Sequence, residues 1–145
     1  MILMKRHQTL ALVRAAVTVG ALLSFPTHGR SEWRVDKPGI ATLGEVGGRA
    51  TLFIQCSRQG ADPGLSLHQA VSETHLVLTY RFDDNTPETR RVAVSGSGHV
   101  LKIWSDDEKE QFARSRRLRI QLRPFVVLDF DLRGIEAVAA KLQCR

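Results

Sequence analysis

The chain has 145 residues, and its 21 Lys and Arg outnumber its 15 Asp and Glu, which gives a formal net charge of +6. No repeat, linker or low-complexity segment divides the sequence, so we expect one domain. A charge this high favours a nucleic-acid partner only where the cations belong to the folded domain.

Residues 1–29 have the order of a secretory signal peptide. The cations Lys5, Arg6 and Arg14 precede the largely apolar run AAVTVGALLSF, and no acidic residue occurs before Glu32. That run has 11 residues, whereas a helix needs about 20 to span a bilayer. We therefore expect export without a stable membrane span, with an uncleaved anchor or an organellar transit peptide as the alternatives.

Cleavage is predicted after Gly29, because the segment THG places small residues at Thr27 and Gly29. The mature domain, 30–145, then has 116 residues, and because three of the 21 cations leave with the signal it keeps 18 cations against 15 anions. This balance is ordinary and predicts no nucleic-acid partner. The protein is expected in the periplasm or outside the cell.

The sequence contains two cysteines, Cys56 and Cys144. An even number of cysteines in a chain addressed to an oxidising compartment predicts a disulfide. The bridge would close a loop of 89 residues and stabilise the fold by roughly 4.6 kcal/mol through the lost entropy of the unfolded chain. A redox-active or metal-binding pair is the weaker interpretation, since the sequence has no C-x-x-C motif and no matching His cluster.

Period-2 alternation of apolar residues dominates the mature chain and predicts about six short antiparallel strands. The segment 75–94 is predicted to be a β-hairpin, because DDNTP between its two apolar runs is typical of a turn. SGSG at 95–98 predicts a second turn. The expected strands lie at 50–56, 75–82, 90–94, 99–104, 117–123 and 125–131.

Two helices are predicted among these strands. Ser105 and Glu108 form a capping box, and the acids that follow Ser105 suit the first turn of a short helix. The final segment, GIEAVAAKLQC, has the apolar spacing of an amphipathic helix that lies against the sheet. Its apolar stripe comprises Ile135, Val138, Ala139 and Leu142. The predicted fold class is α+β, mainly an antiparallel β-sheet with a short internal helix, a C-terminal helix and one disulfide.

Several segments from Tyr80 onward occur in a recognisable order: TYRFDDNTPETRR, a Trp-containing strand after a small-residue turn, RLRIQLRP and DFDLRGIEAVAAKLQC. This order resembles the C-terminal part of the small exported proteins of the type VI secretion-associated VasI/TagO group. The resemblance implies a related fold and a secretion-associated role, and it rests on a structural signature without a catalytic group. Its best-matching residues are Phe130, Asp131, Gly134, Ile135 and Cys144.

Asp129 and Asp131 are one candidate catalytic pair. They are two residues apart in a predicted strand, so their carboxylates could share one face about 7 Å apart, within the range of an inverting glycosidase pair. Asp131, however, directly precedes the last helix, where a cap or turn residue is expected. We therefore favour a structural role for both carboxylates.

The histidines and serines give no stronger indication of catalysis. His68, His75 and His99 lack metal-ligand spacing, and we interpret them as solvated or locally hydrogen-bonded side chains. Ser95 and Ser97 lie in SGSG, which lacks the G-x-S-x-G pattern of a nucleophile elbow. No catalytic residue, no cofactor and no metal site is predicted.

The segment beginning at Ser97 also resembles a binding loop. Some periplasmic lysozyme inhibitors, which are small disulfide-linked β proteins, insert an S-G-x-x-Y loop into the lysozyme cleft. Ser97 and Gly98 match the start of that pattern, and Leu101 stands where the Tyr would be. Lysozyme inhibition is therefore an alternative function.

Arg117, Arg119 and Arg123 should line one face of a strand, with Arg114 and Arg116 close by in sequence. Guanidinium groups bind phosphates and carboxylates through two parallel hydrogen bonds, so this face is a candidate anion-binding site. The alternative is a solvated face that the preceding acidic residues partly neutralise.

Taken together, these patterns predict a non-catalytic accessory or binding protein of the periplasm or cell envelope. The resemblance to the VasI/TagO group adds a role in secretion to this expectation. Its expected partner is an envelope protein or an anionic envelope polymer. Lysozyme inhibition and cell-wall hydrolysis are the two alternative functions.

Overall fold

The fold is a pair of facing antiparallel sheets with two helices, seen in a computed structural model that describes residues 32–142 and 144, except 124 and 125. The predicted signal peptide, 1–29, lies outside the described residues. The described elements are β1 (Arg34–Lys37), β2 (Ile40–Gly44), β3 (Ala50–Ser57), β4 (Gly60–Leu67), β5 (His75–Phe82), β6 (Glu88–Ala93), β7 (Val100–Leu101), α1 (Asp106–Arg114), β8 (Arg117–Arg123), β9 (Val126–Asp131) and α2 (Ile135–Leu142).

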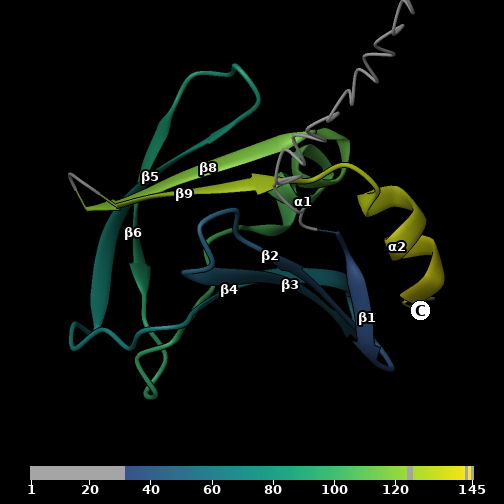
Figure 1. The fold of residues 1–145 in the computed structure, drawn as a ribbon, viewed down its shortest axis with the longest axis horizontal. Coiled ribbons are helices and arrows are strands. Elements are labelled where there is room, and N and C mark those ends of the chain that lie inside the picture. The colour runs from purple at the N-terminus through teal and green to yellow at the C-terminus, as the bar shows by residue number, and fades with distance from the viewer. Residues whose placement is uncertain (1–31, 124–125, 143, 145) are drawn as a thin grey trace, which may run out of the picture.

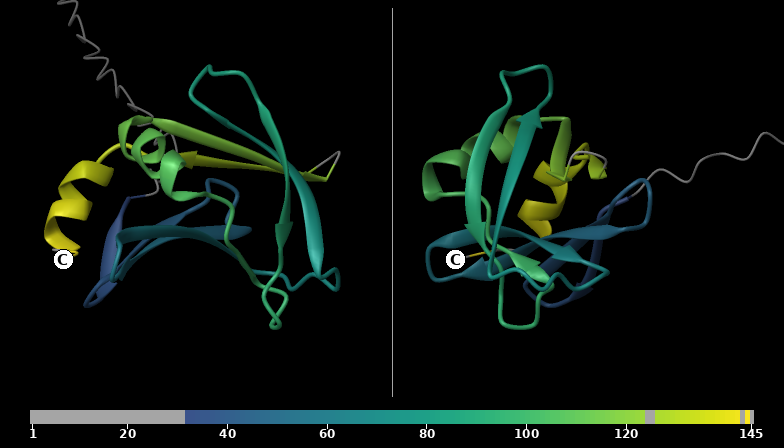
Figure 2. Two further views of the ribbon diagram at one scale, coloured as in Figure 1. Left: turned by 180° about the vertical axis from the view of Figure 1, so that it is seen from behind. Right: turned by 90° about the vertical axis from the view of Figure 1, so that its left-hand side faces the viewer.

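The first sheet has the order β1-β2-β3-β4-β7, and the second has the order β6-β5-β8-β9. Neighbouring strands are antiparallel in both sheets. Figure 1 shows the two sheets facing each other, with α2 beside β1 at one end of the molecule. Figure 2 gives the same arrangement from behind and from the side. The expectation of a mainly antiparallel α+β fold is confirmed, with the described strands divided between two sheets.

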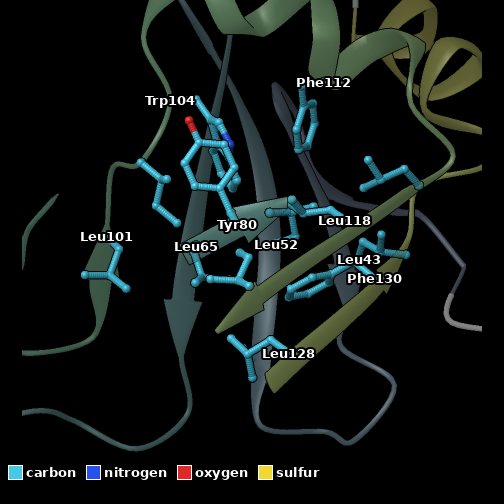
Figure 3. Close-up of a cluster of buried hydrophobic side chains, with 14 of the residues drawn as sticks. Leu43, Leu52, Leu65, Tyr80, Leu101, Trp104, Phe112, Leu118, Leu128 and Phe130 are labelled. Atoms are coloured by element: carbon cyan, nitrogen blue, oxygen red, sulfur yellow. The ribbon is translucent and has the colours of Figure 1, made fainter. Parts of the chain in front are cut away.

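The core lies between the sheets and follows directly from the period-2 pattern. Leu52 pairs with Leu43 on one side and Leu65 on the other, so three leucines form a row across the first sheet. In the second sheet, Leu118 pairs with Phe130. All five side chains are fully buried, and Figure 3 shows them gathered in one cluster. Burial of this apolar surface is the main force that holds the sheets together.

The structure contains more strands than the predicted six. The hairpin formed by β5 and β6 is confirmed, with its five-residue turn at 83–87, whereas β1, β2 and β4 were not predicted. Strand β4 contains Gly60, Pro63 and Gly64, which are unfavourable in strand interiors. Gly64 is explained by Phe53 of β3, because a Cβ at Gly64 would lie 2.3 Å from the Phe53 ring.

The expected strand at 99–104 is mostly irregular, and only Val100–Leu101 form a strand. This strand, β7, pairs with β4 of the first sheet, so the chain passes from one sheet to the other after β6. The predicted turn at 95–98 is confirmed, with Gly98 at φ +74° and its N–H donating to the Ser95 carbonyl at 2.8 Å. A Cβ at Gly98 would lie 2.5 Å from the Val71 carbonyl oxygen, so a close approach requires glycine here.

The C-terminal helix is fixed to the first sheet by the predicted disulfide. Cys56 of β3 is bonded to Cys144, just beyond α2. Ile135, Val138 and Leu142 of α2 are buried, as the predicted apolar stripe requires, while Ala139 is only half-buried. The bridge therefore holds α2 against the sheet edge near β1 and β2.

Replacing both Cys56 and Cys144 with Ala should lower the free energy of unfolding by about 2–5 kcal/mol, the usual cost of removing a native disulfide from a small domain. Urea unfolding measures this loss, and thiol titration of the unfolded wild type should find no free cysteine. Two reactive thiols in the wild type would contradict the bridge.

A partly buried polar cluster connects β5, β6 and α1. Glu108 accepts hydrogen bonds from the Ser105 N–H at 2.8 Å, from Arg90 at 2.6 Å and from the Tyr80 hydroxyl. The Ser105 contact confirms the predicted capping box. Burial alone would raise the pKa of Glu108, but the bonds from Arg90, Tyr80 and Ser105 outweigh burial and lower this pKa to about 2. The same neighbourhood raises the pKa of Tyr80, through burial first and then through its bonds to the carboxylates of Glu108 and Glu88.

Glu108→Gln should lower the free energy of unfolding by about 2 kcal/mol at pH 7, since it weakens hydrogen bonds to a charged group in a partly buried ion pair. Because the pKa of Glu108 is lower in the folded state than in the unfolded state, its contribution is complete above about pH 5 and is lost as the pH falls toward 2. Unfolding measured between pH 7 and pH 2.5 should therefore show the two proteins converging in stability. Glu110→Gln, on the exposed face of α1, is the control and should change stability little. A difference that does not depend on pH would contradict this assignment.

Candidate functional site

A cavity in the described part of the chain, which we call the intersheet pocket, has a volume of about 620 Å³. It is formed by the turn before β3, the end of β4 with the segment that follows it, the start of β5, and the adjoining ends of β8 and β9. Figures 1 and 2 show that these segments lie at the end of the molecule away from α2. The lining residues are Gly48, Arg49, Leu67, His68, Gln69, Ala70, Val71, Ser72, Glu73, Leu76, Leu122, Arg123, Val126 and Leu128.

The lining divides into an apolar wall and a polar rim. Leu67, Leu76 and Leu128 are buried and form the deep wall, because each is an inward-facing residue of its strand. The exposed lining residues are mostly polar, and they include the guanidinium groups of Arg49 and Arg123. An apolar cavity with a few polar groups at its opening is the usual form of a small-molecule site.

An ion pair and the hydrogen bonds of one histidine organise the rim. Arg123 forms an ion pair with Glu73 at 2.6 Å, and their side chains are 54% and 43% exposed. The backbone N–H of Glu73 is the first cause that lowers the pKa of its carboxyl, and Arg123 lowers it further. The two ring nitrogens of His68 are occupied, Nδ1 with the Gly48 carbonyl at 2.7 Å and Nε2 with the Thr51 hydroxyl at 2.8 Å. His68 is thus held in place by local hydrogen bonds, in agreement with its sequence interpretation.

Behind the rim, Glu45 joins the turn before β3 to the outer edge of β9. Its side chain is only 2% exposed and accepts hydrogen bonds from the Arg49 guanidinium and the Arg49 N–H, both at 3.0 Å. The Asp129 N–H also points to Glu45, at 3.4 Å, and the Val46 N–H donates to the Asp129 carbonyl at 3.1 Å. Burial raises the pKa of Glu45, but the hydrogen bonds from Arg49 outweigh burial and lower it below its usual value.

The structure separates the three predicted anion-binding arginines. Arg117 binds both carboxylate oxygens of Asp129, and Arg119 lies 3.6 Å from the same carboxylate. Arg123 follows an irregularity in the pairing of β8 with β9 and lies at the pocket rim with Glu73. Arg117 and Arg119 thus share one internal partner on the outer face of the second sheet, whereas Arg123 belongs to the pocket.

That outer face also carries an arginine of β5. Arg81 of β5 is directly opposite Arg119 of β8, and like charges in such pairs are unfavourable. Asp129 offsets part of this repulsion through its contacts with Arg117 and Arg119.

Both carboxylates of the candidate catalytic pair, Asp129 and Asp131, are bound by arginines. Arg117 is the main cause that lowers the pKa of Asp129, and Asp131 binds Arg133 with both carboxylate oxygens. An inverting glycosidase needs one carboxyl with a raised pKa to act as the acid. The geometry of Asp129 and Asp131 therefore favours the structural interpretation.

The loop that resembles a lysozyme-inhibitor motif is built into the fold. Leu101, which occupies the Tyr position of that motif, is fully buried in β7. The Ser95 hydroxyl lies 2.9 Å from that of Ser97 and accepts the Val100 N–H at 3.1 Å, which are contacts of a tight turn. A buried Leu101 cannot reach another protein's cleft without leaving the core.

The pocket residues other than Arg123 were not predicted as a site. Glu45 and Arg49 have a local signal, because opposite charges flank the turn Gly47-Gly48 between two strands. His68 was noted, but nothing in its spacing links it to Glu73 or Arg123. Within the described ranges, no group of three or more His, Cys, Asp or Glu residues is placed to hold a metal ion, and no described helix has the length and apolar character needed to cross a bilayer.

Comparisons of the chain with protein-family models, with curated proteins and with solved structures found no match.

Glu45→Gln should lower the free energy of unfolding by about 1–3 kcal/mol, because the Arg49 guanidinium loses the carboxylate that holds it. Amide hydrogen exchange at Asp129 should also accelerate, since its N–H faces Glu45. Urea unfolding and NMR-detected exchange measure the two effects. Glu136→Gln, on the exposed side of α2, is the control, and equal effects of both substitutions would contradict the role of Glu45.

Proposed function

We propose that this protein is an exported, non-catalytic binding protein of the cell envelope and that the intersheet pocket is its ligand site. The observation that carries the proposal is the pocket itself, whose volume of about 620 Å³ lies within the range of about 300–1,000 Å³ that is typical of ligand sites. The signal-like segment at 1–29 supports export, and the disulfide suits an oxidising compartment.

The chemistry of the rim supports binding over catalysis. Glu73 has a lowered pKa and an arginine partner, and both ring nitrogens of His68 are already occupied. Neither group is poised as a general acid or base, which would require a pKa close to the operating pH and access to a substrate proton. The resemblance to the VasI/TagO group supports, within this proposal, a secretion-associated role.

Ala70→Trp should block the pocket, because Ala70 is an exposed lining residue outside the strands, where an indole can be added without repacking the core. The mature protein should enhance the fluorescence of the neutral apolar probe N-phenyl-1-naphthylamine, and Ala70→Trp should weaken this binding at least tenfold. Ala113→Trp introduces the same side chain on the exposed face of α1 and should bind the probe like the wild type.

Thermal unfolding of both variants distinguishes a blocked pocket from a misfolded protein. The proposal fails if a folded Ala70→Trp variant binds the probe as tightly as the Ala113→Trp variant does, or if the wild type binds neither this probe nor single-chain alkyl compounds such as decanol and decanoate.

A further inference from the structure

We infer that the intersheet pocket binds a single alkyl chain that ends in an anionic group, with the chain against the leucine wall and the anion beside Arg123. This inference rests on the proposed function and names the class of ligand. It combines three properties of one cavity: the composition of its wall, the charge of its rim and the state of the carboxylates around it.

The wall selects an apolar group. Leu67, Leu76 and Leu128 are between 0% and 7% exposed and belong to three different strands. Leu122 and Val126 continue this surface toward the opening. A polar group placed against these side chains would lose its hydrogen bonds to water without replacement, whereas the burial of each CH₂ group of an alkyl chain is favourable.

The rim selects the charge of the head group. Two of its side chains are cationic, Arg49 and Arg123, and one is anionic, Glu73. The carboxylate of Glu45 pairs with Arg49, but it is almost fully buried and is not part of the lining. A ligand at the opening therefore meets more positive than negative side chains.

Arg123 is the better placed of the two cations to bind a head group. The Arg49 guanidinium already donates through Nη2 to Glu45 and to the Val127 carbonyl. Arg123 donates through the same type of nitrogen to the exposed Glu73. A guanidinium has five N–H donors in a planar fork, so Arg123 can bind a carboxylate or phosphate through a second pair of donors.

Such a ligand can be a free fatty acid or a single-chain phospholipid, since both present an anion at the end of an alkyl chain. Isothermal titration with decanoate and decyl phosphate, each below its micelle concentration, separates these sources by head group. Decyltrimethylammonium and decanol are the cationic and neutral comparisons with the same chain.

Decanoate or decyl phosphate should bind at least tenfold more tightly than decyltrimethylammonium. Arg123→Gln should weaken binding of the preferred anion about fivefold to tenfold and leave decanol binding within twofold of the wild type. Arg117→Gln is the matched control, because Arg117 is paired with Asp129 away from the pocket, and it should bind the anion like the wild type.

Different results would contradict the proposed function and the inferred head group. If all four compounds bind with equal affinity and Ala70→Trp blocks them all, the pocket is a binding site but the inferred anionic head group is wrong. The head-group inference is also wrong if Arg123→Gln and Arg117→Gln bind decanoate and decyl phosphate as the wild type does. If neither the four compounds nor the neutral naphthylamine probe bind to the folded wild type, the proposed function itself is wrong.

Discussion

The hydrogen bonds of one buried carboxylate, Glu45, fix how the two sheets meet beside the pocket. Glu45 and the turn that it organises occupy the outer edge of β9, which would otherwise present open backbone groups to another strand. Because the carboxylate keeps its charge through Arg49, its burial is tolerated. The same turn places Arg49 at the rim, so the contact that joins the sheets also shapes the opening of the candidate site.

At the opposite end of the molecule, a covalent bond takes the place of these hydrogen bonds. There the Cys56–Cys144 bond ties α2 to the first sheet, and the buried face of α2 covers the sheet edge near β1 and β2. Leucine and aromatic side chains fill the interior between these ends (Figure 3). The pocket therefore lies where neither the helix nor the central core fills the space between the sheets, and its leucine wall continues the core outward.

Local patterns predicted the local parts of this fold. The capping box at Ser105 and the hairpin turn before β6 are determined by residues within a few positions of each other, and both are confirmed. Strand β4 was missed because its Gly64 makes sense only beside Phe53 of the neighbouring strand. The pocket could not be predicted for a similar reason, since Glu73 and Arg123 are 50 positions apart and come together only through the pairing of β5 with β8.

The arginines of β8 show why a residue type alone does not identify a site. Arg117 binds Asp129 through two parallel hydrogen bonds, and Arg119 lies beside the same carboxylate. If Arg117 left Asp129 to bind a ligand, the half-buried carboxylate of Asp129 would lose its main partner. The Arg123–Glu73 pair is exposed on both sides, and such pairs contribute only about 0–1 kcal/mol. An incoming anion can therefore compete for Arg123 at small energetic cost. Of three similar side chains on one strand, the one in the most exposed ion pair is the most suited to binding a ligand.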